Sequence, residues 1–310
     1  MPEFDIVSLG EPMVEFNQTR PGEPAYLQGF GGDTSNAAVA AARQGARVAY
    51  VTRLGADPFG EMLRRMWRDE GVDASAVAAD PAAHTGVYFV THAAGGHEFS
   101  YLRAGSAASR MRPADVPLEL IRTARYFHTS GISQAVSANA CDAVLHAIDV
   151  AREAGVQVSY DPNLRLKLWP IQRARAITAA TAAQADYFLP SLEDAHALCG
   201  ATTPEAVVRW AHEVLGVAVV CVKLGAKGVL VSDGDERELV PGFKVETVDA
   251  TGAGDCFDGA LLARLVAGDT IWEAARYANA AAALATTGFG AIAPLPRPDA
   301  VRTLLATMQD

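Results

Sequence analysis

An α/β fold is predicted, in which a mostly parallel central sheet carries helices on both faces and a small β-sheet lid is added to it. β-branched apolar runs alternate with Ala-rich helical stretches, which is typical of βαβ units and a parallel sheet. Residues 85–105 break this alternation with two strands around "AAGG", which predicts a hairpin. With 310 residues, the chain is long enough for one large domain.

The strands expected in the central sheet end in small or polar residues. They comprise residues 4–10, 47–55, 124–131, 156–163, 185–191 and 217–225. Helical periodicity lies between them, and the four clearest helical segments each close on a glycine: residues 35–45, 60–71, 138–155 and 204–216. Ligands of such sheets bind outside the carboxyl ends of the strands, so functional residues are expected there.

The lid is predicted from two segments, residues 12–30 and 84–106, inserted in a single domain that spans residues 1–310. The first segment has no helical pattern, and the second contains the hairpin. A thin sheet leaves one face and its edges exposed, and a neighbour commonly covers them. We therefore expect a homo-oligomer whose subunits meet through the lid.

Composition narrows the class of partner. The formal net charge of −10 disfavours nucleic acid. No apolar run approaches the ~20 residues of a membrane helix, so no membrane association is expected. The N-terminus lacks the pattern of a signal peptide, and the four cysteines are scattered without a CxxC pair. Together these features predict a cytoplasmic protein.

The stretch "DATGAGDCFDG", residues 249–259, combines small residues with a carboxylate at the start of a helical pattern. Gly252, Ala253 and Gly254 are expected to lead into the helix N-terminus, whose unpaired amides make an anion site. Asp255 would stand beside that anion, which is unfavourable unless the carboxylate accepts a proton from an attacking hydroxyl. The alternative is an ordinary capped helix start with no chemical role.

A second glycine-rich stretch, "GGDTSNAAVAAARQG", covers residues 31–45. Gly32 would let the backbone approach a ligand closely. Asp33 and Asn36 offer acceptor and amide groups suited to sugar hydroxyls. The alternative is that these polar residues only cap the following helix.

Two arginines are expected to flank the ligand. Tyr101 and Arg103 end the second lid strand, and Tyr88 lies on the first. Asn163 and Arg165 follow a strand of the body, in "YDPNLRLKLWP". One arginine from the lid and one from the body would suit a single carboxylate. The alternatives are that both are ordinary surface cations, or that Arg165 serves nucleotide phosphates.

Three motifs together resemble one family. "DATGAGDCF" is similar to the C-terminal signature of the ribokinase (PfkB) family of sugar and nucleoside kinases, with Ala250 in place of the usual Thr. Residues 31–45 resemble its other signature, and "VKLGAKG", residues 222–228, resembles its K-L-G-x-x-G segment. The likeness covers essentially the whole chain and agrees with the α/β body and lid expected above. Neither a Walker A motif nor a GxGxxG is present, which disfavours P-loop kinases and Rossmann dehydrogenases.

The resemblance implies ATP as phosphoryl donor and Mg²⁺ to offset its charge, and leaves open whether a monovalent cation assists. It implies Asp255 as the base and the amides of Gly252, Ala253 and Gly254 as the anion hole. The residues assigned to the nucleotide side are Asn163, Ser191, Lys223, Gly225, Gly228 and Asn279. The family's N-x-x-E element is present only as "SLED", with Ser191 and Asp194, so the metal ligands stay unassigned.

Within the family, "GEPMVEFN" and the two arginine segments resemble 2-keto-3-deoxygluconate kinases. Glu15 in that segment falls near the position of the aspartate with which many ribokinases bind the sugar. The first hypothesis is therefore ATP-dependent phosphorylation of 2-keto-3-deoxygluconate at its terminal hydroxyl. A kinase for fructose, another sugar or a nucleoside is the alternative. A non-catalytic sugar-binding protein is disfavoured, because Asp255 and the small residues before it are intact.

Overall fold

The computed structural model describes residues 3–93 and 96–307, and its largest element is a central sheet of nine strands in these residues. The order is β15-β14-β13-β12-β11-β10-β1-β4-β6. Neighbouring strands are parallel from β6 to β13, and β14 and β15 are antiparallel additions at one edge. The bounds are β1 Ile6–Leu9, β4 Val48–Val51, β6 Val72–Asp73, β10 Tyr126–Ser130, β11 Gln157–Asp161, β12 Tyr187–Phe188, β13 Val219–Lys223, β14 Gly228–Ser232 and β15 Arg237–Pro241.

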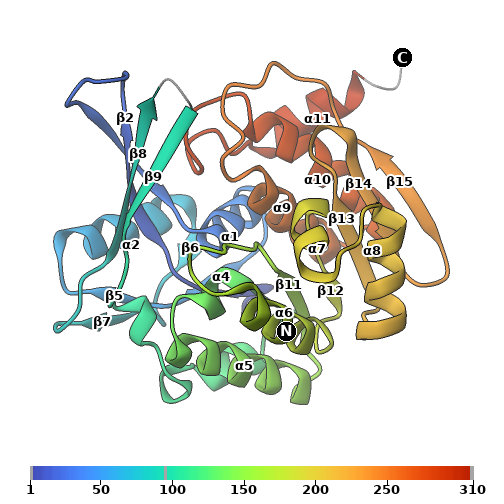
Figure 1. Cartoon of the computed structure of the whole chain (residues 1–310), viewed down its shortest axis with the longest axis horizontal. Coiled ribbons are helices and arrows are strands. Elements are labelled where there is room, and N and C mark those ends of the chain that lie inside the picture. Colours follow the sequence, from blue (N-terminus) through green and yellow to red (C-terminus); the bar gives the residue numbers. More distant parts are fainter. Residues whose placement is uncertain (1–2, 94–95, 308–310) are drawn as a thin grey trace.

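Helices cover both faces of this sheet (Figure 1). They are α1 Asp33–Arg43, α2 Pro58–Glu70, α3 Leu118–Arg122, α4 Gly131–Ala135, α5 Ala138–Glu153, α6 Ile171–Ala182, α7 Leu192–Cys199, α8 Pro204–Trp210, α9 Ala253–Ala267, α10 Ile271–Ala285 and α11 Pro298–Ala306. Strand alternation divides the core into two layers: Ile6 and Tyr50 pack in the layer of α1, α9 and α10, whereas Val7 and Val51 pack in the layer of α5. The predicted fold class is confirmed.

Close packing of α1 on α9 depends on one glycine. A Cβ on Gly259 would lie 2.1 Å from the carbonyl oxygen of Ala37 and 2.8 Å from the Cβ of Ala40. Only a glycine therefore lets the two helices approach to this separation. The contact holds the N-terminal turns of α1 and α9, which carry the two sequence motifs, against each other.

The lid is a separate four-stranded sheet with the order β3-β2-β8-β9. Its strands are β2 Met13–Gln18, β3 Tyr26–Gly31, β8 Gly86–Ala93 and β9 Gly96–Leu102, close to the predicted bounds. The turn expected between the hairpin strands falls on residues 94–95, outside the described residues. A small parallel pair is formed by β5 Arg53–Gly55, between β4 and α2 in the chain, and β7 Ala78–Asp80, between α2 and β8. The reading of residues 1–310 as one domain stays an interpretation.

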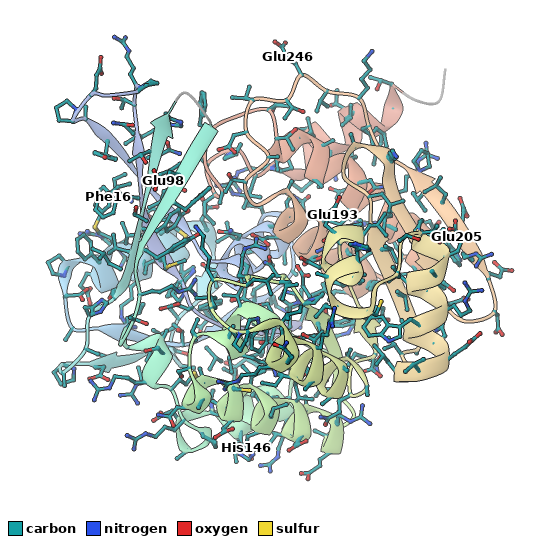
Figure 2. All side chains as sticks on the ribbon, viewed as in Figure 1. Phe16, Glu98, His146, Glu193, Glu205 and Glu246 are labelled. Atoms are coloured by element: carbon teal, nitrogen blue, oxygen red, sulfur yellow. The ribbon has the colours of Figure 1, made fainter. Side chains whose placement is uncertain are left out.

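The two faces of the lid have different surroundings. On one face, the ring of Phe16, which is labelled in Figure 2, stacks on that of Phe89 with centroids 5.3 Å apart. It also meets the ring of Phe59 in α2 edge-on, with centroids 6.1 Å apart. Neighbouring residues of a strand point to opposite faces, so Glu15 and Asn17 belong to the other face, together with Tyr88. That second face is turned toward the motif-bearing helices, as the contacts below show.

Among the described residues, no helix has both the length and the apolar character needed to cross a bilayer.

Candidate active site

The glycine-rich stretch forms a tight turn into α9. Gly252 adopts the left-handed conformation, with φ of 76°, and a Cβ there would lie 3.1 Å from the Cβ of Ala291. Asp249 braces the turn, because its carboxylate accepts from the amide of Thr251 at 2.9 Å and from the amide of Gly290 at 3.0 Å. A glycine at position 252 is therefore required by both backbone and space.

The free amides of this turn differ from the predicted set by one residue. The amide of Ala253 donates to the carbonyl of Ala250 at 3.2 Å, so it is used inside the turn. In the described part of the chain, the amides of Gly252, Gly254 and Asp255 have no such acceptor. The amides open to an anion at this helix N-terminus are therefore those of Gly252, Gly254 and Asp255, whereas the amide expected from Ala253 is already bonded within the turn.

Asp255 is a half-buried carboxylate with a specific partner. The side-chain amide of Asn36 donates to its Oδ2 at 2.8 Å. Burial, and next the charge of Asp33, raise the pKa of Asp255 to about 7, while the Asn36 hydrogen bond opposes that rise. A carboxylate with such a pKa is suited to general-base catalysis at neutral pH.

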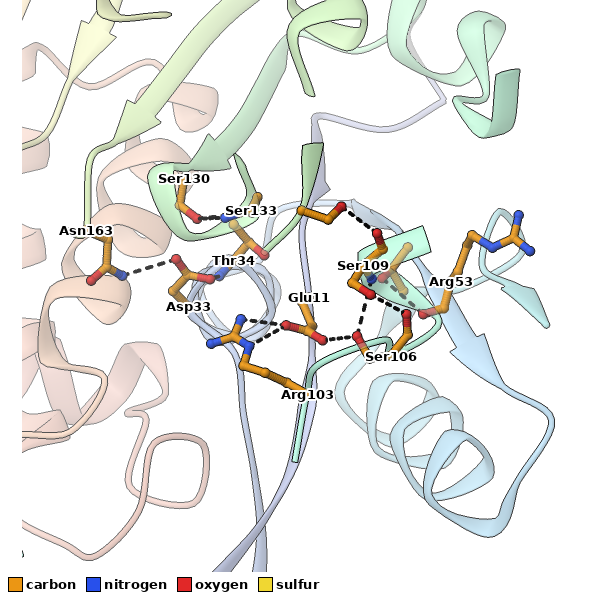
Figure 3. Close-up of polar contacts among 12 residues, drawn as sticks. Glu11, Asp33, Thr34, Arg53, Arg103, Ser106, Ser109, Ser130, Ser133 and Asn163 are labelled. Atoms are coloured by element: carbon orange, nitrogen blue, oxygen red, sulfur yellow. Dashed lines mark hydrogen bonds and ion pairs between the residues drawn. The ribbon is translucent and has the colours of Figure 1, made fainter. Parts of the chain in front are cut away.

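Asp33 opens α1 on the other side of the site. Its Oδ1 accepts from the amide of Thr34 at 2.8 Å, and its Oδ2 accepts from the side chain of Asn163 at 3.1 Å (Figure 3). The N-cap position belongs to Gly32, whose φ is 108° and whose Cβ would lie 2.4 Å from the Glu11 carbonyl oxygen. Asp33 is therefore not the helix cap of the alternative reading. Asn163, which we assigned to the nucleotide, instead contacts a residue of the expected substrate side.

The lid contributes two stacked tyrosines. Tyr88 is buried and donates its hydroxyl to the carboxylate of Glu15, and its ring stacks on Tyr101 with centroids 5.8 Å apart. A Cβ on Gly31 would lie 2.4 Å from the Tyr88 hydroxyl, so this glycine makes room for the ring. Burial raises the pKa of both Tyr88 and Glu15. Charge on Asp255 also acts on Tyr88, which places the tyrosine on the catalytic side of the lid.

Arg103, expected as one of two arginines around a ligand carboxylate, already has a carboxylate partner within the protein, and its ligand contact stays a prediction. Arg103 is not free: its Nε donates to the carboxylate of Glu11 at 2.8 Å, and the two side chains are only 10% and 1% exposed. Ser106 donates its hydroxyl to the same carboxylate (Figure 3). Glu11 and Ser106 stand where the lid joins the body, before β2 and after β9, so the ion pair ties these two connections together.

Arg165 lies elsewhere. Its side chain is exposed and donates to the carbonyl of Leu164 at 2.9 Å. Its charge acts on Asp194, whose pKa is raised to about 6 by burial and by Asp161. Arg165 therefore lies within reach of Asp194 in the "SLED" element, and a contact of Arg165 with phosphates or substrate stays a prediction.

A buried charge cluster lies behind the anion site. Lys223 donates from Nζ to Asp161 Oδ2 at 2.9 Å and to Asp258 Oδ1 at 3.1 Å. A Cβ on Gly254 would lie 3.5 Å from the same Nζ, so the ammonium adjoins the free amides. Sequence reasoning assigned Lys223 but missed both carboxylates. Asp258 lies three residues after Asp255, on the same side of α9, which is the signal that was available.

The pKa values of the three ionisable groups in this cluster are shifted differently. Burial alone would lower the pKa of Lys223, but Asp161 and Asp258 raise it above its ordinary value. Burial alone would raise the pKa of Asp161, but Lys223 holds it below its ordinary value. The pKa of Asp258 is raised by burial despite Lys223. Asp258 therefore holds its proton to higher pH than Asp161 does.

The remaining nucleotide-side residues have clear structural duties. Ser191 is the N-cap of α7 and accepts from the amide of Asp194 at 3.0 Å. Gly225 has φ of 59°, and Gly228 has φ of 102° with a Cβ position only 2.1 Å from the Val240 carbonyl oxygen. Asn279 donates to the same carbonyl at 3.0 Å. Gly228 and Asn279 thus fix β15, and a nucleotide contact by them stays a prediction.

In the residues that the structure describes, no three His, Cys, Asp or Glu side chains converge to hold a metal ion by themselves. A carboxylate with a pKa near neutrality, next to free amides at a helix N-terminus, is equipped to move a phosphoryl group onto a hydroxyl. The site and the ribokinase-like body with its lid thus define a phosphotransferase class.

Comparison with known proteins gives the family. The chain belongs to the pfkB family of carbohydrate kinases, whose model matches residues 3–298. Fructokinase-1 of Oryza sativa subsp. japonica is 39% identical over 306 residues, which cover 94% of each chain. Two solved fructokinases share the fold. The enzyme of Vibrio cholerae O395, bound to fructose, ADP and calcium, has a TM-score of 0.89 at 33% identity and covers 97% of this chain and 99% of its own. That of Xylella fastidiosa, bound to ATP, has a TM-score of 0.89 at 27% identity and covers 99% of both.

The expectation from the motifs that the chain is a sugar kinase of this family is confirmed. The narrower likeness to 2-keto-3-deoxygluconate kinases gains no support, because these relatives are fructokinases.

Proposed function

We propose that this kinase transfers the γ-phosphoryl group of ATP to a primary hydroxyl of a neutral ketohexose, with fructose as the first candidate. The observation that carries this choice is the pairing of Arg103 with Glu11. A sugar carboxylate needs a cation to receive it, and the cation expected in the lid is already neutralised. Asp33, Glu15 and Asp255 line the rest of the site with acids, which favours hydroxyl groups over a carboxylate. The relation to fructokinases supports the same choice.

In this mechanism, Asp255 takes the proton of the acceptor hydroxyl, and the oxygen attacks the γ-phosphorus. A new O–P bond forms as the bond to the β-phosphate oxygen breaks, and ADP leaves. The amides of Gly254 and Asp255 stabilise the charge on the transferring group, with Lys223 close behind them. Asn36 holds the carboxylate of Asp255 in place, while Asp33, Glu15 and Tyr88 are assigned to the sugar hydroxyls.

The residues present also fit Mg²⁺, which neutralises the charge of the triphosphate. Mg²⁺ in such enzymes is held by substrate phosphates and one or two carboxylates. Asp194 fits that need, because it is half-buried, lies close enough for the charge of Lys223 to act on it, and has no ion-pair partner among the described residues. We assign it as the protein ligand. The monovalent cation, the homo-oligomer through the lid and the cytoplasmic location stay predictions.

The test is ATP consumption measured in a coupled assay with fructose, ribose, 2-keto-3-deoxygluconate and adenosine. Fructose is expected to have the highest kcat/KM. A higher kcat/KM for 2-keto-3-deoxygluconate would overturn the neutral-sugar proposal. The Asp255→Asn variant serves as the control for contaminating kinases, because it retains the fold and lacks the base.

One observation keeps the sugar acid as a second candidate. Arg103 Nη2 is buried and, apart from its ion-pair contact with Glu11, has no hydrogen-bond acceptor in the described chain. Its charge also acts on Asp33. A ligand oxygen beside Asp33 would therefore find a donor, whether it belongs to a hydroxyl, a ketone or a carboxylate.

A further inference from the structure

A cavity of about 250 Å³ lies between the outer part of the lid and the loop that follows α10. We propose that it is a subsite for a small uncharged, largely apolar group attached to the acceptor sugar, so that the enzyme also phosphorylates glycosides. This inference rests on the proposed function, because it assumes that the sugar lies between Asp255 and Glu15.

Strand register places the cavity next to the sugar. Glu15 of β2 lies opposite Tyr88 of β8, whose hydroxyl contacts it and which is close enough to Asp255 for that charge to act on its pKa. Asn17 is two residues farther along β2 on the same lid face, about 7 Å outward. Both Glu15 and Asn17 line the cavity. The cavity therefore begins at the end of the sugar site and continues along the lid.

The body side of the cavity leads to the same conclusion. Gly290 and Ala291 line it. A Cβ on Gly290 would lie 3.3 Å from Glu15 Oε1, and the Cβ of Ala291 lies 3.1 Å from the Cβ position of Gly252. One short loop thus separates the cavity from the anion turn. A sugar with its reactive hydroxyl at Asp255 would direct its opposite end into the cavity.

The walls define the chemistry of the ligand. Apolar surface is supplied by Leu27, Phe30, Phe289 and Ile292. Leu27 of the lid and Phe289 of the body loop are each 65% exposed. Large exposed apolar side chains around a hollow are typical of a ligand site. The volume exceeds the roughly 150 Å³ of an apolar cavity that holds benzene. A phenyl-sized group is therefore accommodated.

The polar side chains of the lining bond mainly to the protein itself. Asn17 Oδ1 is 2.9 Å from His92 Nε2, and the side-chain amide of Gln28 donates to the Gly29 carbonyl at 2.8 Å. The lining contains Glu15 and no Lys or Arg. An anionic group is therefore excluded, and an uncharged one is preferred.

The reaction on such a glycoside is the same transfer. The primary hydroxyl of the sugar gives its proton to Asp255, its oxygen bonds to the γ-phosphorus, and ADP leaves. The glycosidic bond stays intact.

The experiment compares methyl and benzyl β-D-fructofuranoside, which differ only in the group expected in the cavity. The benzyl glycoside should show a KM about tenfold lower than the methyl glycoside, as burial of part of a phenyl ring would give. Isothermal titration of both glycosides should give a similar ratio of dissociation constants. The Ala293→Phe and Leu27→Trp variants, which fill the cavity from exposed lining positions, should remove this ratio and leave fructose kinetics within twofold. Val214→Phe, at a position 70% exposed and outside the lining, is the matched control and should keep the ratio.

The outcomes separate the two proposals. No turnover of fructose would overturn the proposed function, while the titration ratio would still test the subsite. Equal binding of the two glycosides, or failure of the benzyl glycoside to bind, would overturn the subsite. So would a benzyl preference that survives both filling variants.

Discussion

The side-chain amide of Asn36 lies 2.8 Å from the carboxylate of Asp255, although 219 positions separate the two residues in the sequence. This contact joins the two signature motifs into one site. It exists because α1 and α9 approach closely at Gly259 and Ala37.

The pH dependence of catalysis should follow the titration of the Asp255 carboxyl group. Because its pKa is raised to about 7, kcat/KM should fall about tenfold per pH unit below that value, as the base becomes protonated. Asn36→Ala removes a hydrogen bond that lowers this pKa, so the acidic limb of the profile should shift to higher pH. An unchanged limb in Asn36→Ala, measured as kcat/KM for the acceptor from pH 5 to 9, would contradict the assignment of the base.

The same residue should affect stability. A carboxyl group whose pKa is higher in the folded than in the unfolded protein stabilises the fold below its unfolded pKa, and this contribution is lost as pH rises through the folded pKa. The window runs from about 4 to 7. Asp255→Asn should therefore raise Tm at pH 8 more than at pH 5, while kcat falls by about 10²–10⁴-fold. Scanning calorimetry at both pH values provides the measurement, and equal shifts would contradict the raised pKa of Asp255.

Gly259→Ala tests the helix contact that brings Asn36 and Asp255 together. The added methyl would meet the Ala37 carbonyl, so we expect a loss of about 1–3 kcal/mol in the free energy of unfolding and a lower kcat. Gly254→Ala is the matched control, since its methyl makes only an ordinary contact 3.5 Å from Lys223. Urea denaturation should separate the two variants, and similar stabilities would contradict the packing argument.

The Lys223 cluster predicts an asymmetry between two carboxylates. Lys223→Met should destabilise the protein by about 3–5 kcal/mol, because it leaves a buried charge without a partner. Asp258→Asn should be tolerated better than Asp161→Asn, since the pKa of Asp258 is raised and that of Asp161 is lowered. Free energies of unfolding from urea titrations check the order. The reverse order would mean that the ionised partner of Lys223 is Asp258.

Glu11→Gln tests the observation behind the neutral-sugar proposal. The variant leaves the charge of Arg103 unpaired in the site while keeping an acceptor for Ser106. The ratio of kcat/KM for 2-keto-3-deoxygluconate over fructose should therefore rise by about tenfold, comparable to one charge-assisted hydrogen bond. A ratio that stays constant while both activities fall would assign Glu11 to the lid connection alone.

Much of the fold follows from local patterns, because strand and helix periodicity and the closing glycines are carried by neighbouring residues. The two motifs also identified the helix N-termini of the site. The pairing of charges was not predictable in this way. Arg103 finds Glu11 across 92 positions, and Asn163 finds Asp33 across 130. Local sequence patterns do not show partners this far apart, so these side chains were interpreted as free to bind ligands.

The lid has a consequence for the order of folding. Its two central strands, β2 and β8, are parallel neighbours, and the chain between them contains β4, α1 and α2 of the body. A parallel pair cannot be closed by a tight turn, so each half of the lid alone is an isolated hairpin of marginal stability. The lid must therefore assemble after the body that it covers. A truncated chain that lacks the intervening body should never form the lid.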